Sequence, residues 1–402
     1  MGEAEAKQGE SGALRVVISS AFVIAMGAVS ANTMGYLVPD LMDDLGISRA
    51  AAGLITGMFF GATGAGAFTA GWLVERLGVR RALVIASLTV TVMATSSSVI
   101  GDYWILLVYG LLCGFAYSMA TIGTNVAVAS VVTERRRGVA MTTKSSFAPF
   151  FSGSSAILVG LFIDDVGWRN VLYVIAGLSV FVALQTSINI PKRASTQTTR
   201  ADGRSPSSPA PRVVWVYGVS VFLSSGGGSA FFLWIVPYLK QQLELSSRTT
   251  GFVAGGMTMS SALGMITIAT FSDRLGVARR FHVIITLTVT CGVAALALAA
   301  NDLLPTWLLF VFLAAGVLTV ATNSGLMHVA IVELAPGSVA RATGITLTGY
   351  YLGSFVAPYA FGFMADNFGY PAAWLASGLA LIVACVMLVW IQTAVVRRQT
   401  VS

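Results

Sequence analysis

A short polar sequence occurs twice in this chain, and each copy lies between two long apolar runs. The first copy is E-R-L-G-V-R-R, Glu75 to Arg81, and the second is D-R-L-G-V-A-R-R, Asp273 to Arg280. The offset between the copies also pairs residues far outside the loops: Pro39 with Pro237, Leu45 with Leu243, Ser48 with Ser246, Gly53 with Gly251, and Gly66 with Gly264. A repeat of this length predicts two halves of similar structure within one chain.

The composition places both halves in a lipid bilayer. Hydrophobic residues make up 56% of the chain and charged residues only 10%, whereas about 25% of the residues of a soluble domain are charged. A membrane-spanning helix needs about 20 apolar residues. The sequence has twelve such runs, and we expect a helix in each: 14–38, 50–74, 82–100, 103–131, 138–163, 169–190, 213–239, 250–271, 282–300, 304–332, 341–364 and 371–396.

A polar segment separates the sixth run from the seventh. Residues 191–212 are rich in proline, serine and basic residues, which is typical of a flexible linker. We therefore expect an all-α membrane protein with twelve transmembrane helices in two pseudo-symmetric bundles of six. The expected boundaries are 1–190 for the first half, 191–212 for the linker and 213–402 for the second half.

The basic residues predict the orientation. Most of the 24 Lys and Arg fall at the termini, in the linker and in the loops on one side. Only Arg49, Arg169, Lys240 and Arg248 fall on the other side. The positive-inside rule then predicts a multi-pass protein of the plasma (inner) membrane with cytoplasmic termini. The net charge of +7 follows from this bias, so it gives no reason to expect a nucleic-acid partner.

Nothing in the sequence indicates a cofactor, a metal or an enzyme. The cysteines Cys113, Cys291 and Cys385 lie in apolar runs without the spacing of metal ligands, so we expect small core residues. The acid pairs Asp43–Asp44 and Asp164–Asp165 lie in short loops without a supporting His or Cys. A phosphate-binding P-loop is also absent, which argues against direct use of ATP.

Read with the helix before it, the first loop is G-W-L-V-E-R-L-G-V-R-R, residues 71–81. It resembles the loop 2–3 signature of the major facilitator superfamily, G-x-L-a-D-R-x-G-R-R/K, although Glu75 replaces the usual Asp. The resemblance implies a twelve-helix fold and secondary transport by alternating access, in which this loop latches the outward-facing state. The implied gating residues are Gly71, Glu75, Arg76, Gly78 and Arg80 in the first copy, and Asp273, Arg274 and Gly276 in the second.

Two departures from the family argue against a typical proton-driven drug exporter. Many drug and sugar transporters carry an Arg in helix 4, four residues before a Gly, but here Gly110 precedes Gly114. The exporter signature of helix 5 is also absent from residues 145–155.

Two basic residues lie inside the predicted spans and away from the first residues of those spans. A charge inside a bilayer costs at least ~2.5–3.5 kcal/mol and so indicates function. Lys144 has no acid at its depth, and we expect it to bind the anionic group of a substrate. The alternative is a lysine that snorkels to the cytoplasm or bonds helix carbonyls. His328 has two open roles, proton or substrate binding and a structural hydrogen bond.

Other polar and aromatic residues complete the predicted substrate site. Asn125, Asn323, Tyr350 and Tyr351 lie at a depth comparable to that of Lys144. In the superfamily helices 1 and 7 line the pathway, which adds Asn32, Tyr36 and Trp234. The glycines 226–228 of helix 7 predict either a hinge or close helix packing.

These features favour a secondary active transporter, expected to be monomeric, for a small organic anion such as a monocarboxylate. If protons are coupled to transport, the candidate carriers are His328, Lys144 and Asp366. Desolvation disfavours the charged form of a buried lysine, so Lys144 is able to link anion and proton movement. A proton-driven multidrug exporter, which needs an acid in its cavity, remains the alternative, as does transport of a neutral solute.

Overall fold

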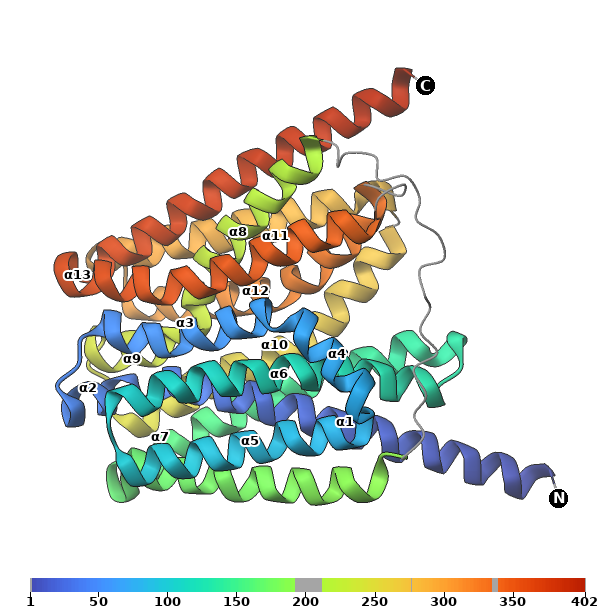
Figure 1. Cartoon of the computed structure of the whole chain (residues 1–402). Helices are drawn as coiled ribbons and strands as arrows, with labels where there is room; N and C mark the ends of the chain where they lie inside the picture. Colours follow the sequence, from blue (N-terminus) through green and yellow to red (C-terminus); the bar gives the residue numbers. More distant parts are fainter. Residues whose placement is uncertain (1, 192–211, 276, 335–338, 402) are drawn as a thin grey trace.

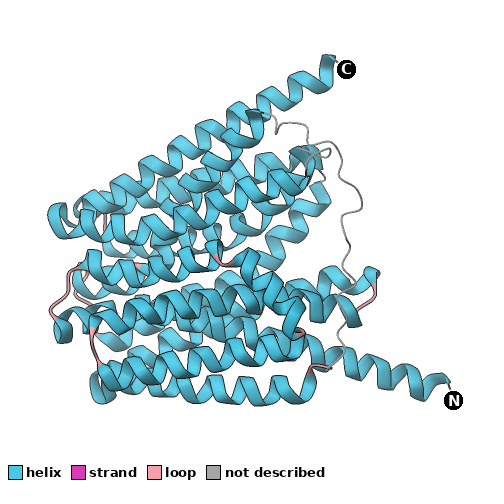
Figure 2. Ribbon diagram, in the orientation of Figure 1, coloured by secondary structure: helices cyan, strands magenta, loops and turns pink. Residues whose placement is uncertain are grey.

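The computed structural model describes residues 2–191, 212–275, 277–334 and 339–401. Within these ranges it does not describe the side chains of some residues, among them Asp273 and His328. These ranges contain only helices and short connections, and no strand (Figure 2). The first half contains α1 (Gly2–Tyr36), α2 (Val38–Leu45), α3 (Arg49–Ala65), α4 (Ala67–Leu77), α5 (Val79–Ile100), α6 (Tyr103–Val131) and α7 (Glu134–Asn189). The second contains α8 (Arg212–Leu233), α9 (Ile235–Gln241), α10 (Ser247–Leu275), α11 (Val277–Ala299), the short 3-10 helix η1 (Asn301–Leu303), α12 (Thr306–Leu334) and α13 (Val339–Val401).

The described helices provide twelve membrane spans. Nine are long and apolar enough to cross a bilayer, and α3 with α4 forms a tenth span that bends by 62°. Two of the nine are double-length helices with a break inside. Gly167 (φ 71°) divides α7, and Gly369 (φ 80°) divides α13. Only glycine adopts such positive φ values at little cost. Each of these helices therefore supplies two spans, and the predicted fold class is confirmed.

The helices form two bundles that lie against each other (Figure 1). Helices α1–α7 make up one bundle and α8–α13 the other, and both chain termini lie at the same end of the molecule. We call this end the terminal face. The other end, which carries α2, α9 and the breaks in α7 and α13, is the opposite face. The boundaries predicted for the halves stay a prediction, since most of the linker lies outside the described residues.

Glycines allow α6 to pack directly onto the backbone of α3. A Cβ atom added to Gly114 would lie 2.8 Å from the carbonyl carbon of Phe59, and one on Gly110 would lie 3.3 Å from that of Ile55. Small residues permit this close approach of membrane helices. Gly110 therefore faces α3, and an arginine at this position has no space.

The glycines of α8 serve close packing. The helix is continuous through residues 226–228 in this conformation, and a hinge there stays a prediction. A Cβ atom on Gly227 would lie 2.8 Å from the carbonyl oxygen of Ser377, and one on Gly228 would lie 2.9 Å from the side chain of Val320. The helix ends at Leu233, and Trp234 (φ −108°, ψ 3°) separates it from α9.

Candidate functional site

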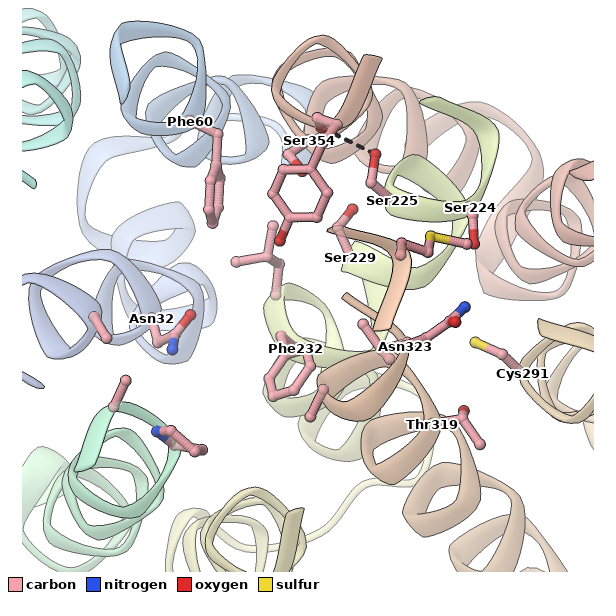
Figure 3. Close-up of a pocket in the computed structure, with 18 of the residues that line it drawn as sticks. Asn32, Phe60, Ser224, Ser225, Ser229, Phe232, Cys291, Thr319, Asn323 and Ser354 are labelled. Carbon is pink, nitrogen blue, oxygen red and sulfur yellow. Dashed lines mark hydrogen bonds between the residues drawn. The ribbon is translucent and has the colours of Figure 1, made fainter. Parts of the chain in front are cut away.

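A cavity of about 300 Å³ lies between the two bundles (Figure 3). Its polar lining comes mainly from α8 and α12, and its aromatic lining comes from both bundles. Every described residue of the lining is uncharged at neutral pH. The polar members are Asn32, Ser145, Ser224, Ser225, Ser229, Thr319, Asn323 and Ser354, and the aromatic members are Phe60, Tyr117, Phe232 and Tyr350.

Hydrogen bonds to the backbone orient the α8 hydroxyl groups. Ser225 Oγ donates to the carbonyl oxygen of Tyr350 at 3.0 Å, and Ser229 Oγ donates to that of Gly226 at 2.7 Å. Because each proton is used in this way, the serine oxygens keep lone pairs that can accept a hydrogen bond. In Figure 3 the side chain of Ser229 and the ring of Phe232 lie on the same wall of the cavity. This wall therefore offers acceptors for hydroxyl groups beside an aromatic surface.

Asn32 lies on the other wall, on α1. Its Nδ2 atom donates to Ser152 Oγ of α7 at 3.0 Å. Figure 3 shows the amide of Asn32 at the edge of the cavity, across from Phe232. Asn32 is thus a predicted site residue that the structure brings to the cavity, together with Asn323 and Tyr350.

Lys144 lies outside the cavity lining, next along α7 to a residue that lines it. Its side chain is buried, and its Nζ atom donates to Asn125 Oδ1 and, at 3.2 Å, to Thr124 Oγ1. Both partners are neutral, and none of the ion pairs between described residues includes Lys144. Its neighbour Ser145 lines the cavity. A buried ammonium group without a counter-charge is costly, so an anion in the adjacent cavity would stabilise it.

Asn323 occupies the equivalent place in the second half. It stands at the repeat position of Asn125, and its Nδ2 atom donates to Thr288 Oγ1 at 2.9 Å. The hydroxyl group of Thr288 itself donates to the carbonyl oxygen of Ile284 at 2.8 Å. Since Thr288 can then only accept, the amide of Asn323 has a single orientation. Each half thus has an asparagine bonded to a neighbouring helix, but only the first half places a lysine there.

Asn125, the exposed partner of Lys144, is also outside the cavity lining, and so are three other predicted site residues. Tyr36 is buried near the opposite face, where it borders a small void with Asp40. Trp234 is buried and stacks on Phe361 with ring centroids 5.2 Å apart. Tyr351 packs against Tyr350 with centroids 5.3 Å apart. Their predicted contact with a substrate stays untested.

The polar contacts between the bundles gather at the opposite face. Asp366 pairs with Arg49 at 3.4 Å, and Lys240 pairs with Asp40 at 3.4 Å. Burial raises the pKa of the Asp40 carboxyl group, and Lys240 opposes this shift. Asp366 is therefore engaged between the bundles here, and its role in proton coupling remains a prediction.

The predicted gating loop lies at the terminal face. Gly78 has a φ of 80°, as expected for a glycine that turns the chain between α4 and α5. The guanidinium of Arg76 lies over the ring of Trp72, 5.1 Å from its centroid. Glu75 is exposed and takes part in no ion pair recorded for the described residues. In the second copy Arg274 is exposed, and Gly276 and the side chain of Asp273 lie outside the described residues. The side chain of the predicted proton carrier His328 also lies outside them.

Comparisons with known proteins agree with this architecture. The sequence profile of the Major Facilitator Superfamily matches residues 18–235 and again 217–401. The chain belongs to this superfamily. The xylose transporter XylE from E. coli, solved in an inward open conformation, has a similar fold, with a TM-score of 0.75 at 14% identity over 94% of this chain and 95% of XylE. Because the profile matches each half, it also accounts for the internal repeat.

Two curated relatives of this protein are named as transporters of aromatic acids. A gallate transporter of Pseudomonas putida is 27% identical over 39% of this chain, and a 4-hydroxybenzoate transporter of the same species is 27% identical over 50%. The aligned segments span only 35% and 46% of those proteins, respectively. The family and these relatives are transporters and not enzymes.

The gating loop leads to a first testable expectation. Replacing Arg76 by alanine removes the cation at the end of α4, and we expect it to slow transport about tenfold, equivalent to ~1.4 kcal/mol. Substrate affinity should stay unchanged, because Arg76 is exposed and does not belong to the cavity lining, in which Phe60 is the described residue of α3. Initial rates and equilibrium binding, measured on the same purified variant, separate the two effects. A large loss of affinity at an unchanged rate would contradict a gating role.

Proposed function

We propose that this protein carries a small organic anion, a single-ring aromatic carboxylate, across the membrane by alternating access. The supporting observation is the buried Lys144, next along α7 to Ser145 of the cavity lining. Among the described residues its Nζ atom is bonded to neutral oxygen atoms, and the described lining carries no charge. A substrate carboxylate would provide the missing negative charge, and an ion pair is strong where water is excluded.

The size and lining of the cavity fit this class of substrate. Ligand sites commonly enclose ~300–1,000 Å³, so a cavity of about 300 Å³ suits a compound with one ring. Phe60, Tyr117, Phe232 and Tyr350 provide aromatic surface on which such a ring can stack. The names of the gallate and 4-hydroxybenzoate transporters support the same chemistry. No carboxylate is found in the described lining, which disfavours binding of a cationic drug.

The proposal also includes the orientation in the membrane and the source of energy. The bias of basic residues in the sequence supports a cytoplasmic terminal face in the plasma (inner) membrane. Transport driven by a proton gradient, with Lys144, His328 or Asp366 as the proton carrier, is the coupling we propose. The protein would act on its substrate as a monomer within the bilayer.

Uptake into proteoliposomes tests the function directly. We expect accumulation of 4-hydroxybenzoate, faster when the lumen is more alkaline than the medium, and little uptake of the neutral 4-hydroxybenzamide or of a cationic dye. Protein-free liposomes with the same pH gradient correct for passive entry of the protonated acid. Selective accumulation of the dye would instead support the multidrug alternative, and uptake of the amide would support transport of neutral solutes.

A further inference from the structure

Two acidic residues outside the cavity occupy equivalent places at the opposite face. Asp164 lies in the first arm of α7 (134–166), and Asp366 lies in the first arm of α13 (339–368). Each follows a glycine by four positions, in the sequences G-L-F-I-D from Gly160 and G-F-M-A-D from Gly362. The two halves thus carry the same short motif at the corresponding helix end.

Asp366 binds the start of α3, which belongs to the other bundle. Its Oδ1 atom accepts from the backbone N–H of Arg49 at 3.1 Å, and its Oδ2 atom accepts from that of Ala50 at 2.9 Å. These N–H groups belong to the first turn of the helix, where no intrahelical partner exists. The carboxylate also lies at the positive end of the helix dipole. The next free N–H group, that of Ala51, donates to the capping residue Ser48 at 3.2 Å.

Asp164 makes the reciprocal contact. Its Oδ1 atom accepts from Ser247 Oγ at 2.8 Å, and Ser247 is the first residue of α10. Ser247 stands at the repeat position of Arg49, and Ser246, which accepts from the N–H of Thr249 at 3.2 Å, stands at that of Ser48. An acid of each bundle therefore binds the beginning of the second span of the other bundle.

The glycines of the motif make both contacts possible. A Cβ atom on Gly160 would lie 2.5 Å from the carbonyl oxygen of Ser247, and one on Gly362 would lie 2.5 Å from that of Arg49. The helices hence meet backbone to backbone at both places. An acid four residues further along lies on the same helix face, one turn closer to the end. The two crossings share this close approach at the glycine, although Asp366 accepts from backbone N–H groups and Asp164 accepts from a side-chain hydroxyl group.

From this symmetry we infer that Asp164 and Asp366 are paired gate residues, which together we call the reciprocal clasp. Both contacts cross the boundary between the bundles at the opposite face, and both must break before the cavity can open there. The two sides differ in strength. Both aspartates are exposed, but Asp366 accepts from two backbone N–H groups and also pairs with Arg49, whereas Asp164 accepts one hydrogen bond, from Ser247, among the contacts of the described residues. The clasp concerns the transport cycle of any substrate and does not depend on the proposed aromatic acid.

Thiol accessibility tests the clasp. Cys113, Cys291 and Cys385 are first replaced by serine, and Ser229 of the cavity lining is replaced by cysteine. A membrane-impermeant methanethiosulfonate reagent is then applied to vesicles of both orientations. With the reagent at the opposite face, we expect about tenfold faster modification for Asp366→Ala and about threefold faster modification for Asp164→Ala. An increase of tenfold corresponds to ~1.4 kcal/mol in the opening equilibrium.

Conservative and neighbouring substitutions make the result specific. Asp366→Asn keeps an oxygen that can cap the helix, so we expect it to recover part of the wild-type protection. Asp165→Ala and Asn367→Ala change the adjacent exposed residues and should leave the rate unchanged. Thermal unfolding of each variant shows whether the fold persists. The clasp is refuted if both aspartate-to-alanine proteins fold and are modified at the rate of their parent, or if the control variants accelerate modification equally.

Discussion

Replacing Lys144 by alanine is expected to weaken the binding of 4-hydroxybenzoate about 30-fold or more, because removal of one partner of a buried charge pair costs ~2–5 kcal/mol. Lys144 is buried beside Ser145 of the cavity lining and has no acidic partner among the described residues. The bound carboxylate would therefore lose the cation that the described residues place beside the lining. Lys144→Arg retains the charge and should bind more tightly than the alanine variant.

The neutral ligand 4-hydroxybenzamide serves as the control for this variant. It has the ring and the hydroxyl group of the acid but lacks the negative charge, so its affinity should be the same for wild type and Lys144→Ala. Equilibrium binding of both ligands to purified protein gives the comparison. An equal loss for both would mean that Lys144 holds α7 against α6 through Asn125 and has no part in anion binding. Unchanged affinity for the acid in both variants would exclude the role altogether.

Replacing Gly114 by valine is expected to cost a large part of the stability of the first bundle. A Cβ atom there would meet the backbone of Phe59, with its Cα atom 2.9 Å away, and a helix backbone cannot yield as a side chain can. Overpacking of this kind commonly costs ~1–3 kcal/mol. We expect a clear fall in the midpoint of thermal unfolding in detergent, together with loss of uptake.

Gly177→Val provides the matched control for this substitution. Gly177 also lies within a helix, but a Cβ atom there would have no heavy atom within 4 Å. Valine at this position should leave the midpoint at or near the wild-type value. If both variants unfold alike, the effect arises from valine in a helix and not from the contact between α6 and α3.

Sequence patterns predicted much of the fold because the bilayer restricts it so strongly. Long apolar runs must become helices, and the repeat around Glu75 and Asp273 shows that the halves are related. Depth along a helix was also predictable. Counting residues from the polar turn placed Lys144 and Asn125 at one level, and the structure joins them by a hydrogen bond.

Which face of a helix points into the cavity was much harder to predict. An apolar residue in a membrane is equally at home against lipid or another helix, so the cavity residues Phe60, Tyr117 and Met265 gave no signal. Trp234 lies in the predicted seventh span but turns into the core. The motif around Gly160 was missed for another reason. Its copy at Gly362 follows a different offset from the one that joins Gly53 to Gly251, although the recurrence of the motif is visible in the sequence alone.

The breaks at Gly167 and Gly369 also bear on how the chain enters the membrane during synthesis. Each joins two full spans with essentially no loop between them. A ribosome-bound chain cannot leave such a pair half inserted, since the first span would hold the second at the bilayer surface with its apolar residues in water. We therefore expect each pair to cross as one helical hairpin. Lengthening the turn at either glycine would allow the two spans of that pair to insert separately. The topology of the second span of the pair would then depend on its own flanking charges.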